Sequence, residues 1–182
     1  ERRENKKVMS EILRREKEIY TIAHDMTNGM GPLRTGSASD PIRCAILISG
    51  SGSGMQAMVT HQQTHLDCGH RTVLVISDNP EATGLMKAEQ LGIQAHCIAL
   101  PEEADRTLRR HLHEQQILSL IQEHQIELIL LSGYMRLVSA DFVDHWTPRI
   151  INIHPSLLPA FPGAHAHRDV LAAGVEVSGC TV

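Results

Sequence analysis

No apolar run in this chain approaches the roughly 20 consecutive residues that a membrane helix needs. Residues 1–7 are mostly charged, so they lack the apolar core of a secretory signal peptide. Basic residues show no excess either: 17 Lys and Arg stand against 21 Asp and Glu, a net charge of −4. This balance gives no electrostatic reason to expect nucleic acid. We therefore expect a cytoplasmic protein with neither a membrane nor a nucleic acid as partner.

Closely spaced cysteines are also missing. Cys44, Cys68, Cys97 and Cys180 lie far apart and form no C-x-x-C pair. A disulfide framework or a zinc knuckle would need tighter and more regular spacing. The pattern favours small buried thiols in a reducing compartment.

Histidine, in contrast, is abundant, with 12 residues in the chain. The pair His165 and His167 would need a third metal ligand, and nothing in the sequence supplies one. His111 and His113 fall in a strongly charged helical stretch, where solvated surface residues are expected. We expect no metal.

The length of 182 residues suits one domain with a small appendage, and 42% apolar and 21% charged residues are ordinary for a globular protein. Residues 1–27 show apolar residues at three- and four-residue spacings and are predicted to form an amphipathic helix. Residues 28–41, rich in Gly, Ser and Pro, are predicted to be a linker. The helix would allow a homodimer. The main domain is expected at 42–182.

Short apolar runs alternate with helical stretches through this domain. Such runs, each separated by a helix, indicate a parallel sheet covered on both faces. The expected fold class is α/β, an open, mostly parallel twisted sheet with helices on both faces, preceded by the N-terminal helix. The expected strands are residues 43–49, 72–77, 95–100, 127–132, 150–153 and 177–182, and the expected helices are 55–65, 82–91, 102–124, 140–146 and 168–173.

A glycine-rich loop, residues 50–54, joins the first expected strand to its helix. Backbone N–H groups and the helix N-terminus make such a turn a phosphate site. The dinucleotide fingerprint G-x-G-x-x-G is not met, because Met55 stands where the third glycine should be. The loop also lacks the lysine of a P-loop. A single phosphate monoester fits it better.

Asn152 and His154 lie two residues apart on the fifth expected strand, so both side chains face the same side. Ile151 and Ile153 should then face a core on the other side. An amide N–H can donate to a tetrahedral oxyanion, and an imidazole can supply a proton to a departing amine. A rigid loop with three prolines and a glycine follows at residues 155–163, which is typical of a site.

The segment 131–138 leaves the fourth expected strand at the same edge of the sheet, where ligands of open α/β sheets bind. Its apolar residues would offer a wall to a flat heterocycle, and Arg136 could meet a carboxylate.

Together, the segments 47–53, 132–136, 152–163 and 165–168 resemble phosphoribosylglycinamide formyltransferase, a folate-dependent enzyme of purine biosynthesis with a Rossmann-like fold. The similarity runs from about residue 43 to residue 182. It implies transfer of a formyl group from the co-substrate 10-formyltetrahydrofolate to the amine of glycinamide ribonucleotide.

The resemblance also implies site residues. His154 would be the general acid that protonates the leaving folate nitrogen, and Asn152 the donor to the oxyanion. The ribose phosphate would lie on Gly52, Ser53 and Gly54. The implied folate-binding residues are Arg110, Met135, Arg136, Leu137, Val138 and Asn152.

Two features depart from the family pattern. Gly54 stands where an asparagine is usual, which removes a side-chain donor from the phosphate loop. The family also carries an aspartate in a loop that would follow residue 182, so we expect the catalytic domain to be incomplete at this end.

Three alternatives stay open. One is formyltetrahydrofolate deformylase, a hydrolase with a similar Asn-x-His segment, and another is a catalytically incomplete fragment that binds phosphate or folate. The third is a nucleotide-dependent oxidoreductase with Asp78 as ribose ligand, against which the absent third glycine argues. A methionyl-tRNA formyltransferase is disfavoured because this domain is acidic.

Overall fold

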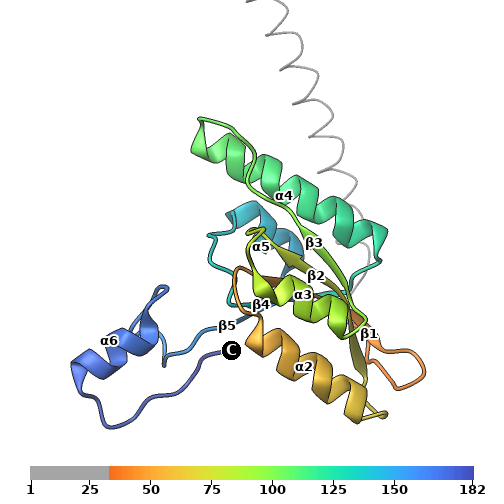
Figure 1. The fold of residues 1–182 in the computed structure, drawn as a ribbon, viewed down its shortest axis with the longest axis horizontal. Coiled ribbons are helices and arrows are strands. Elements are labelled where there is room, and N and C mark those ends of the chain that lie inside the picture. Colours follow the sequence, from red (N-terminus) through yellow and green to blue (C-terminus); the bar gives the residue numbers. More distant parts are fainter. Residues whose placement is uncertain (1–32) are drawn as a thin grey trace, which may run out of the picture.

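The computed structural model describes residues 33–182, so the predicted helix at 1–27 and the first part of the predicted linker lie outside the described residues. Strands and helices alternate from residue 42 onward (Figure 1). None of the described helices is both long enough and apolar enough to cross a membrane. The elements are β1 (Ile42–Ile48), α2 (Ser53–Thr64), β2 (His70–Ser77), α3 (Thr83–Gln90), β3 (Gln94–Cys97), α4 (Arg106–Glu123), β4 (Leu128–Ser132), α5 (Ala140–Trp146), β5 (Ile150–Ile153) and α6 (Ala166–Ala173).

The five strands form one sheet in the order β3-β2-β1-β4-β5, and all neighbouring strands are parallel. The chain builds outward from β1 to β3, returns, and then builds outward on the other side through β4 and β5. The strand order therefore reverses between β1 and β4, the place where open α/β sheets bind ligands. The predicted fold class is confirmed for the described residues.

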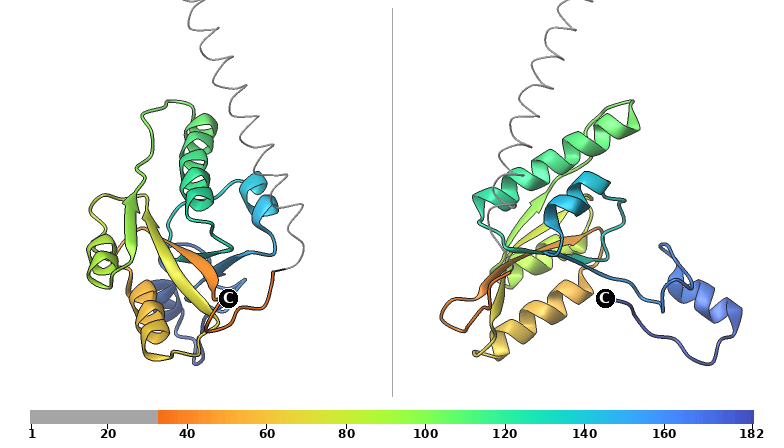
Figure 2. Two further views of the ribbon diagram at one scale, coloured as in Figure 1. Left: turned by 90° about the vertical axis from the view of Figure 1, so that its right-hand side faces the viewer. Right: turned by 180° about the vertical axis from the view of Figure 1, so that it is seen from behind.

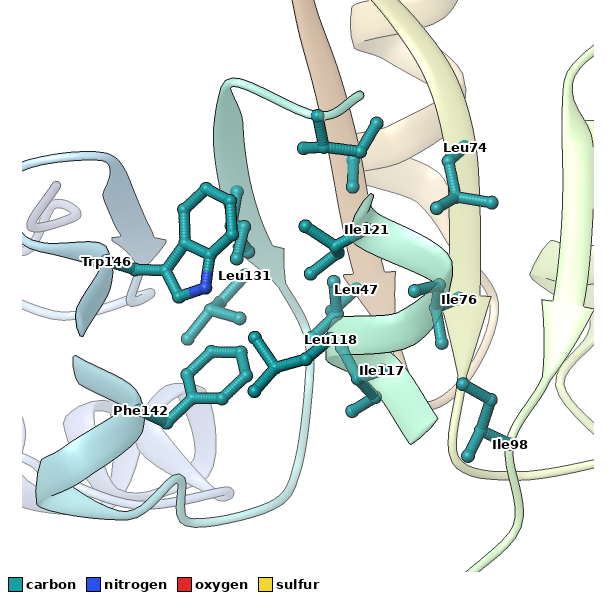
Figure 3. Packing of buried hydrophobic residues seen from close by; sticks show 13 residues of the cluster. Leu47, Leu74, Ile76, Ile98, Ile117, Leu118, Ile121, Leu131, Phe142 and Trp146 are labelled. Atoms are coloured by element: carbon teal, nitrogen blue, oxygen red, sulfur yellow. The ribbon is translucent and has the colours of Figure 1, made fainter. Parts of the chain in front are cut away.

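Side chains of the central strands alternate between two cores, one on each face of the sheet. Leu47 of β1 packs with Ile117 and Leu118 of α4 and with Phe142 of α5 (Figure 3). Ile48, the next residue, faces the other core with α2 and α3. Both faces are covered by helices in the views of Figure 2. This double covering explains why the strands are continuous apolar runs.

Helix α4 begins later than the sequence predicts, at Arg106 rather than at residue 102. Asp105 is its N-cap, and one carboxylate oxygen of Asp105 accepts hydrogen bonds from the backbone N–H groups of Thr107 and Leu108 at 2.8 and 2.9 Å. An Asp side chain that satisfies these N–H groups fixes the start of a helix. Strand β3 is also shorter than predicted, with four residues.

Two predictions near the end of the chain were wrong. No sixth strand forms at residues 177–182; only an isolated antiparallel bridge joins Thr181 to His154. Ile153 does not enter a core, because it lies at the end of the outermost strand of the sheet and is 43% exposed. The segment that carries α6 projects away from the layered body (Figures 1 and 2).

Candidate functional site

The three sequence motifs meet at one edge of the sheet, because they follow the neighbouring strands β1, β4 and β5. Leu47 of β1 pairs with Leu131 of β4, and Leu131 pairs in turn with Asn152 of β5. The loops after β1 and β4 are also joined directly: the N–H of Ser49 donates to the carbonyl of Gly133 at 3.1 Å. The motifs thus share the crevice at which the strand order reverses.

The glycine-rich loop, the predicted anion cradle, leaves backbone donors free at the start of α2. Gly52 is the N-cap of α2, has a φ of 63° in the left-handed region, and offers no side chain to cap the helix. The first N–H groups of α2, at Ser53, Gly54 and Met55, have no partner within the helix. Ser53 and Gly54 are exposed, and unpaired N–H groups at the positive end of a helix can bind an anion.

Close packing from behind holds this loop in place. The N–H of Gly84, at the start of α3, donates to the carbonyl of Gly50 at 3.0 Å, and a Cβ on Gly52 would lie 3.0 Å from the Cα of Gly84. The ammonium of Lys87, also on α3, donates to the carbonyl of Ser51 at 2.9 Å. This contact brings a positive charge beside the loop.

Gly54 makes the contact between the loop and β4. A Cβ at Gly54 would lie 2.4 Å from the hydroxyl oxygen of Ser132, the last residue of β4. The glycine therefore allows the first turn of α2 to approach the edge of β4 closely. Gly54 therefore lacks the side-chain donor that an asparagine would offer, but it allows α2 to lie close to Ser132.

The predicted apolar wall is only partly present. Met135 and Leu137 are exposed, at 59% and 85%, and are free to contact a ligand. Val138 and Tyr134 instead pack against the core on the α4 side of the sheet. The N–H of Met135 donates to the hydroxyl of Ser49 at 2.8 Å. This hydrogen bond connects the loop after β4 to the start of the glycine-rich loop.

Asn152 and His154 stand where the sequence places them. Asn152 is exposed, and His154 is half-buried directly after β5. The Nε2 of His154 lies 3.1 Å from the carbonyl oxygen of Phe161. A carbonyl can only accept, so Nε2 of His154 is the donor in this hydrogen bond. The backbone of His154 is fixed by two hydrogen bonds with Thr181, each 2.9 Å.

The proline-rich loop after His154 is held from within. Ser156 is fully buried, and its hydroxyl lies 2.7 Å from the carbonyl oxygen of Ala160 and 3.0 Å from that of Phe161. Its own carbonyl accepts from the Thr181 hydroxyl at 2.8 Å. These contacts position the Phe161 carbonyl that orients the imidazole of His154.

His113 was wrongly predicted as a solvated surface residue. It is 3% exposed, and its Nε2 lies 2.8 Å from the hydroxyl of Tyr134. The pKa of His113 is lowered from 6.5, mainly by burial. Burial likewise raises the pKa of Tyr134 above its ordinary value. Both side chains are thus neutral near neutral pH and form a buried polar pair beneath the wall.

Arg110, also predicted to bind folate, lies three residues before His113 on α4. Residues three apart lie on the same face of a helix. Arg110 is half-buried and lies about one helical turn before His113, which contacts Tyr134.

Sequence reasoning also missed an ion pair. Asp78, directly after β2, pairs with Arg136 of the wall, with Nε and Oδ2 2.5 Å apart. The sequence suggests Asp78 only as a ribose ligand of an oxidoreductase, whereas in the structure its Oδ2 pairs with Arg136. The position of Asp78 directly after a strand, at the same sheet edge as the other motifs, could have indicated from the sequence that it belongs to the site.

The remaining cysteine and histidine predictions have mixed outcomes. All four cysteines are free thiols, but only Cys44 is buried. Burial raises the pKa of Cys44 to about 12. His165 and His167 are exposed at the start of α6. Across residues 33–182, no group of three or more His, Cys, Asp or Glu side chains could hold a metal ion.

Known proteins resemble this chain over most of its described residues. A family model described as formyl transferase matches residues 42–182. The chain is 37% identical over 139 residues to the phosphoribosylglycinamide formyltransferase of Bacillus subtilis (strain 168), covering 76% of this chain and 68% of that protein. The crystal structure of phosphoribosylglycinamide formyltransferase from Brucella melitensis has a TM-score of 0.70 and 40% identity, covering 78% of this chain and 71% of that one.

A longer protein matches over a smaller share of its length. The trifunctional purine biosynthetic protein adenosine-3 of Gallus gallus is 40% identical over 144 residues, which cover 79% of this chain and 14% of that protein. The chain therefore spans about two thirds of the Bacillus subtilis protein and about one seventh of the Gallus gallus one.

Proposed function

This chain belongs to the formyl transferase family, and from that premise we propose that it carries the site for transfer of a formyl group from 10-formyltetrahydrofolate to the amine of glycinamide ribonucleotide. The observation that carries the proposal is the meeting of three motifs at one edge of the sheet. The phosphate cradle follows β1, the wall follows β4, and the pair Asn152 and His154 lies on and directly after β5.

The two substrates would occupy the two sides of this crevice. We assign the ribonucleotide phosphate to the N–H groups at Gly52, Ser53 and Gly54. The folate would lie along the exposed wall, in contact with residues of the loop after β4, of α4 and of β5. The assigned folate-binding residues are Arg110, Met135, Arg136, Leu137, Val138 and Asn152.

The reacting group would lie between the two sides, beside Asn152 and His154. The substrate amine attacks the formyl carbon, and the carbonyl oxygen becomes an oxyanion. The amide of Asn152 donates a hydrogen bond to that oxygen, which stabilises the charge that develops. The imidazole of His154 gives a proton to the departing folate nitrogen as the old C–N bond breaks. The attacking amine loses one proton, so the overall proton count is unchanged.

Substitution of the two reacting residues tests the proposal directly. In the full protein, His154→Ala and Asn152→Ala should each reduce formyl transfer by at least about a hundredfold, since one general acid or one oxyanion donor contributes about that much. The measurement follows both folate product and formylated ribonucleotide. His167→Ala, an exposed histidine on α6, is the matched control and should keep wild-type turnover.

The same assay separates the alternatives. Release of formate without consumption of the ribonucleotide would support the deformylase instead. Binding of phosphate or folate with no turnover would support an incomplete site. Homodimer formation and a cytoplasmic location stay predictions.

A further inference from the structure

The ion pair between Asp78 and Arg136 joins two parts of the site that lie far apart in the chain. Asp78 follows β2, Arg136 lies in the wall after β4, and the two are 58 positions apart in the sequence. The Asp78 side chain is 3% exposed, whereas that of Arg136 is 49% exposed. The pair thus anchors a surface arginine to a carboxylate in the interior.

Arg136 is the cation that balances this carboxylate. His113 also lies close enough to Asp78 to be affected by its charge, but burial lowers the pKa of His113 and leaves it neutral near neutral pH. Among residues 33–182, Arg136 is the only ion-pair partner of Asp78. A buried carboxylate with a single cation holds that cation firmly, because separation would leave the charge unpaired.

The contact uses only one of the three nitrogens of the guanidinium group. Nε donates to Asp78, and within the described part of the chain the two terminal nitrogens of Arg136 make no hydrogen bond. A guanidinium group held by Nε leaves its terminal N–H groups as donors that can grip a carboxylate or a phosphate. Arg136 is half-exposed, so these donors are accessible to a ligand on the wall.

We propose that Asp78 is a positioning residue that holds Arg136 ready to bind a carboxylate of the folate glutamyl tail. This inference rests on the proposed function. The tail carboxylates are the negatively charged groups of a reduced folate near neutral pH, so they are what a guanidinium group on the wall would recognise. An arginine already fixed at Nε loses less side-chain freedom when the ligand binds than a free one does.

If Asp78 had a different role, its removal would change the affinity for the folate tail in the opposite direction. If Asp78 only neutralised Arg136, its removal would leave a freer and more strongly positive side chain, and binding of the acidic tail would become tighter. If Asp78 positions Arg136, its removal weakens binding. The direction of the change therefore separates the two roles.

The experiment measures dissociation constants by calorimetry for two ligands and three forms of the full protein. The ligands are 10-formyltetrahydrofolate and its analogue without the glutamyl tail. The forms are wild type, Asp78→Ala and the control Glu81→Ala, whose exposed carboxylate makes no hydrogen bond among the described residues. Asp78→Asn, which keeps the size of the side chain and an acceptor for Nε, replaces Asp78→Ala if that variant does not fold.

We expect Asp78→Ala to raise the dissociation constant of the complete folate about two- to tenfold, the effect of ordering one long side chain. Binding of the tail-less analogue should not change, and Glu81→Ala should change neither constant. Equal weakening for both ligands, no change for either, or tighter binding of the complete folate would each overturn the inference. If the wild type binds neither ligand, the proposed function itself fails, and the inference fails with it.

Discussion

Replacement of Gly84 by Ala tests how α3 supports the phosphate cradle. A Cβ on Gly84 would lie 2.4 Å from Cδ1 of Ile48, 2.9 Å from the carbonyl oxygen of Gly50 and 3.1 Å from the Cα of Gly52. Two of these atoms belong to the backbone of the loop, so rotation of a side chain cannot make room. The loop itself must move away from α3.

The expected magnitude combines two opposing effects. Ala is favoured over Gly in a helix by up to about 1 kcal/mol. Overpacking of a tight contact costs about 1–3 kcal/mol. The free energy of unfolding should therefore fall by up to about 2 kcal/mol, which lowers Tm by roughly 4–8 °C for a chain of this size. If the shifted loop loses one hydrogen bond to the charged phosphate, worth about 1.5 kcal/mol, the Kd for glycinamide ribonucleotide rises roughly tenfold.

Thermal unfolding and calorimetric titration with glycinamide ribonucleotide measure the two effects of Gly84→Ala. Gly50→Ala is the matched control in the same loop, because a Cβ there meets no atom within 4 Å. It should change the free energy of unfolding by less than about 0.5 kcal/mol. Wild-type stability and affinity in Gly84→Ala, or equal losses in both variants, would refute the view that close packing of α3 holds the cradle.

Two further predictions concern the helices around the site. Ser139→Ala should lower the free energy of unfolding by about 2–4 kcal/mol in urea titrations. The Ser139 hydroxyl is the N-cap of α5 and accepts a hydrogen bond from the N–H of Phe142. It also donates to the buried carboxylate of Glu114 at 2.6 Å. His113→Phe should make stability less sensitive to acid, because burial lowers the pKa of His113 from 6.5 and the unfolded chain binds its proton more tightly. The contribution of His113 to the loss of stability as the pH falls below about 6.5 should therefore disappear in urea titrations.

Each of these predictions has a matched control. Asp105→Ala removes an exposed N-cap from α4 and should cost only about 1 kcal/mol. An equal loss at Ser139 would show that the bond to Glu114 adds nothing. His167→Phe removes an exposed histidine and should leave the pH dependence as in the wild type. If His113→Phe also leaves it unchanged, burial does not hold the imidazole neutral.

The order of strands and helices could be predicted because it depends on local patterns. Continuous apolar runs between helical stretches mark buried parallel strands, and the bounds of β5 and α5 agree with the prediction to the residue. The predicted strand at 177–182 failed because its apolar residues fit a strand, but pairing depends on a neighbour. Only Thr181 finds one, at His154.

The candidate site also contains features that the sequence predicts and contacts that it does not. The cradle, the wall and the pair Asn152 and His154 each lie within one short segment, so the sequence indicates them, and their roles stay predictions. The contacts of Asp78 with Arg136 and of His113 with Tyr134 join residues 58 and 21 positions apart. Such contacts depend on how the loop after β4 folds back over α4 and β2. No local sequence pattern predicts these contacts.

The strands that carry the two sides of the site are held to different degrees. In the described sheet, β1 has a hydrogen-bonded neighbour on each side, whereas β5 is paired along its length with β4 alone. Segments with fewer backbone partners open at lower free energy than the core of a domain. Among the described residues, the backbone amide of Asn152 in β5 should therefore exchange its hydrogen faster than that of Leu47 in β1, which hydrogen-exchange measurements would show.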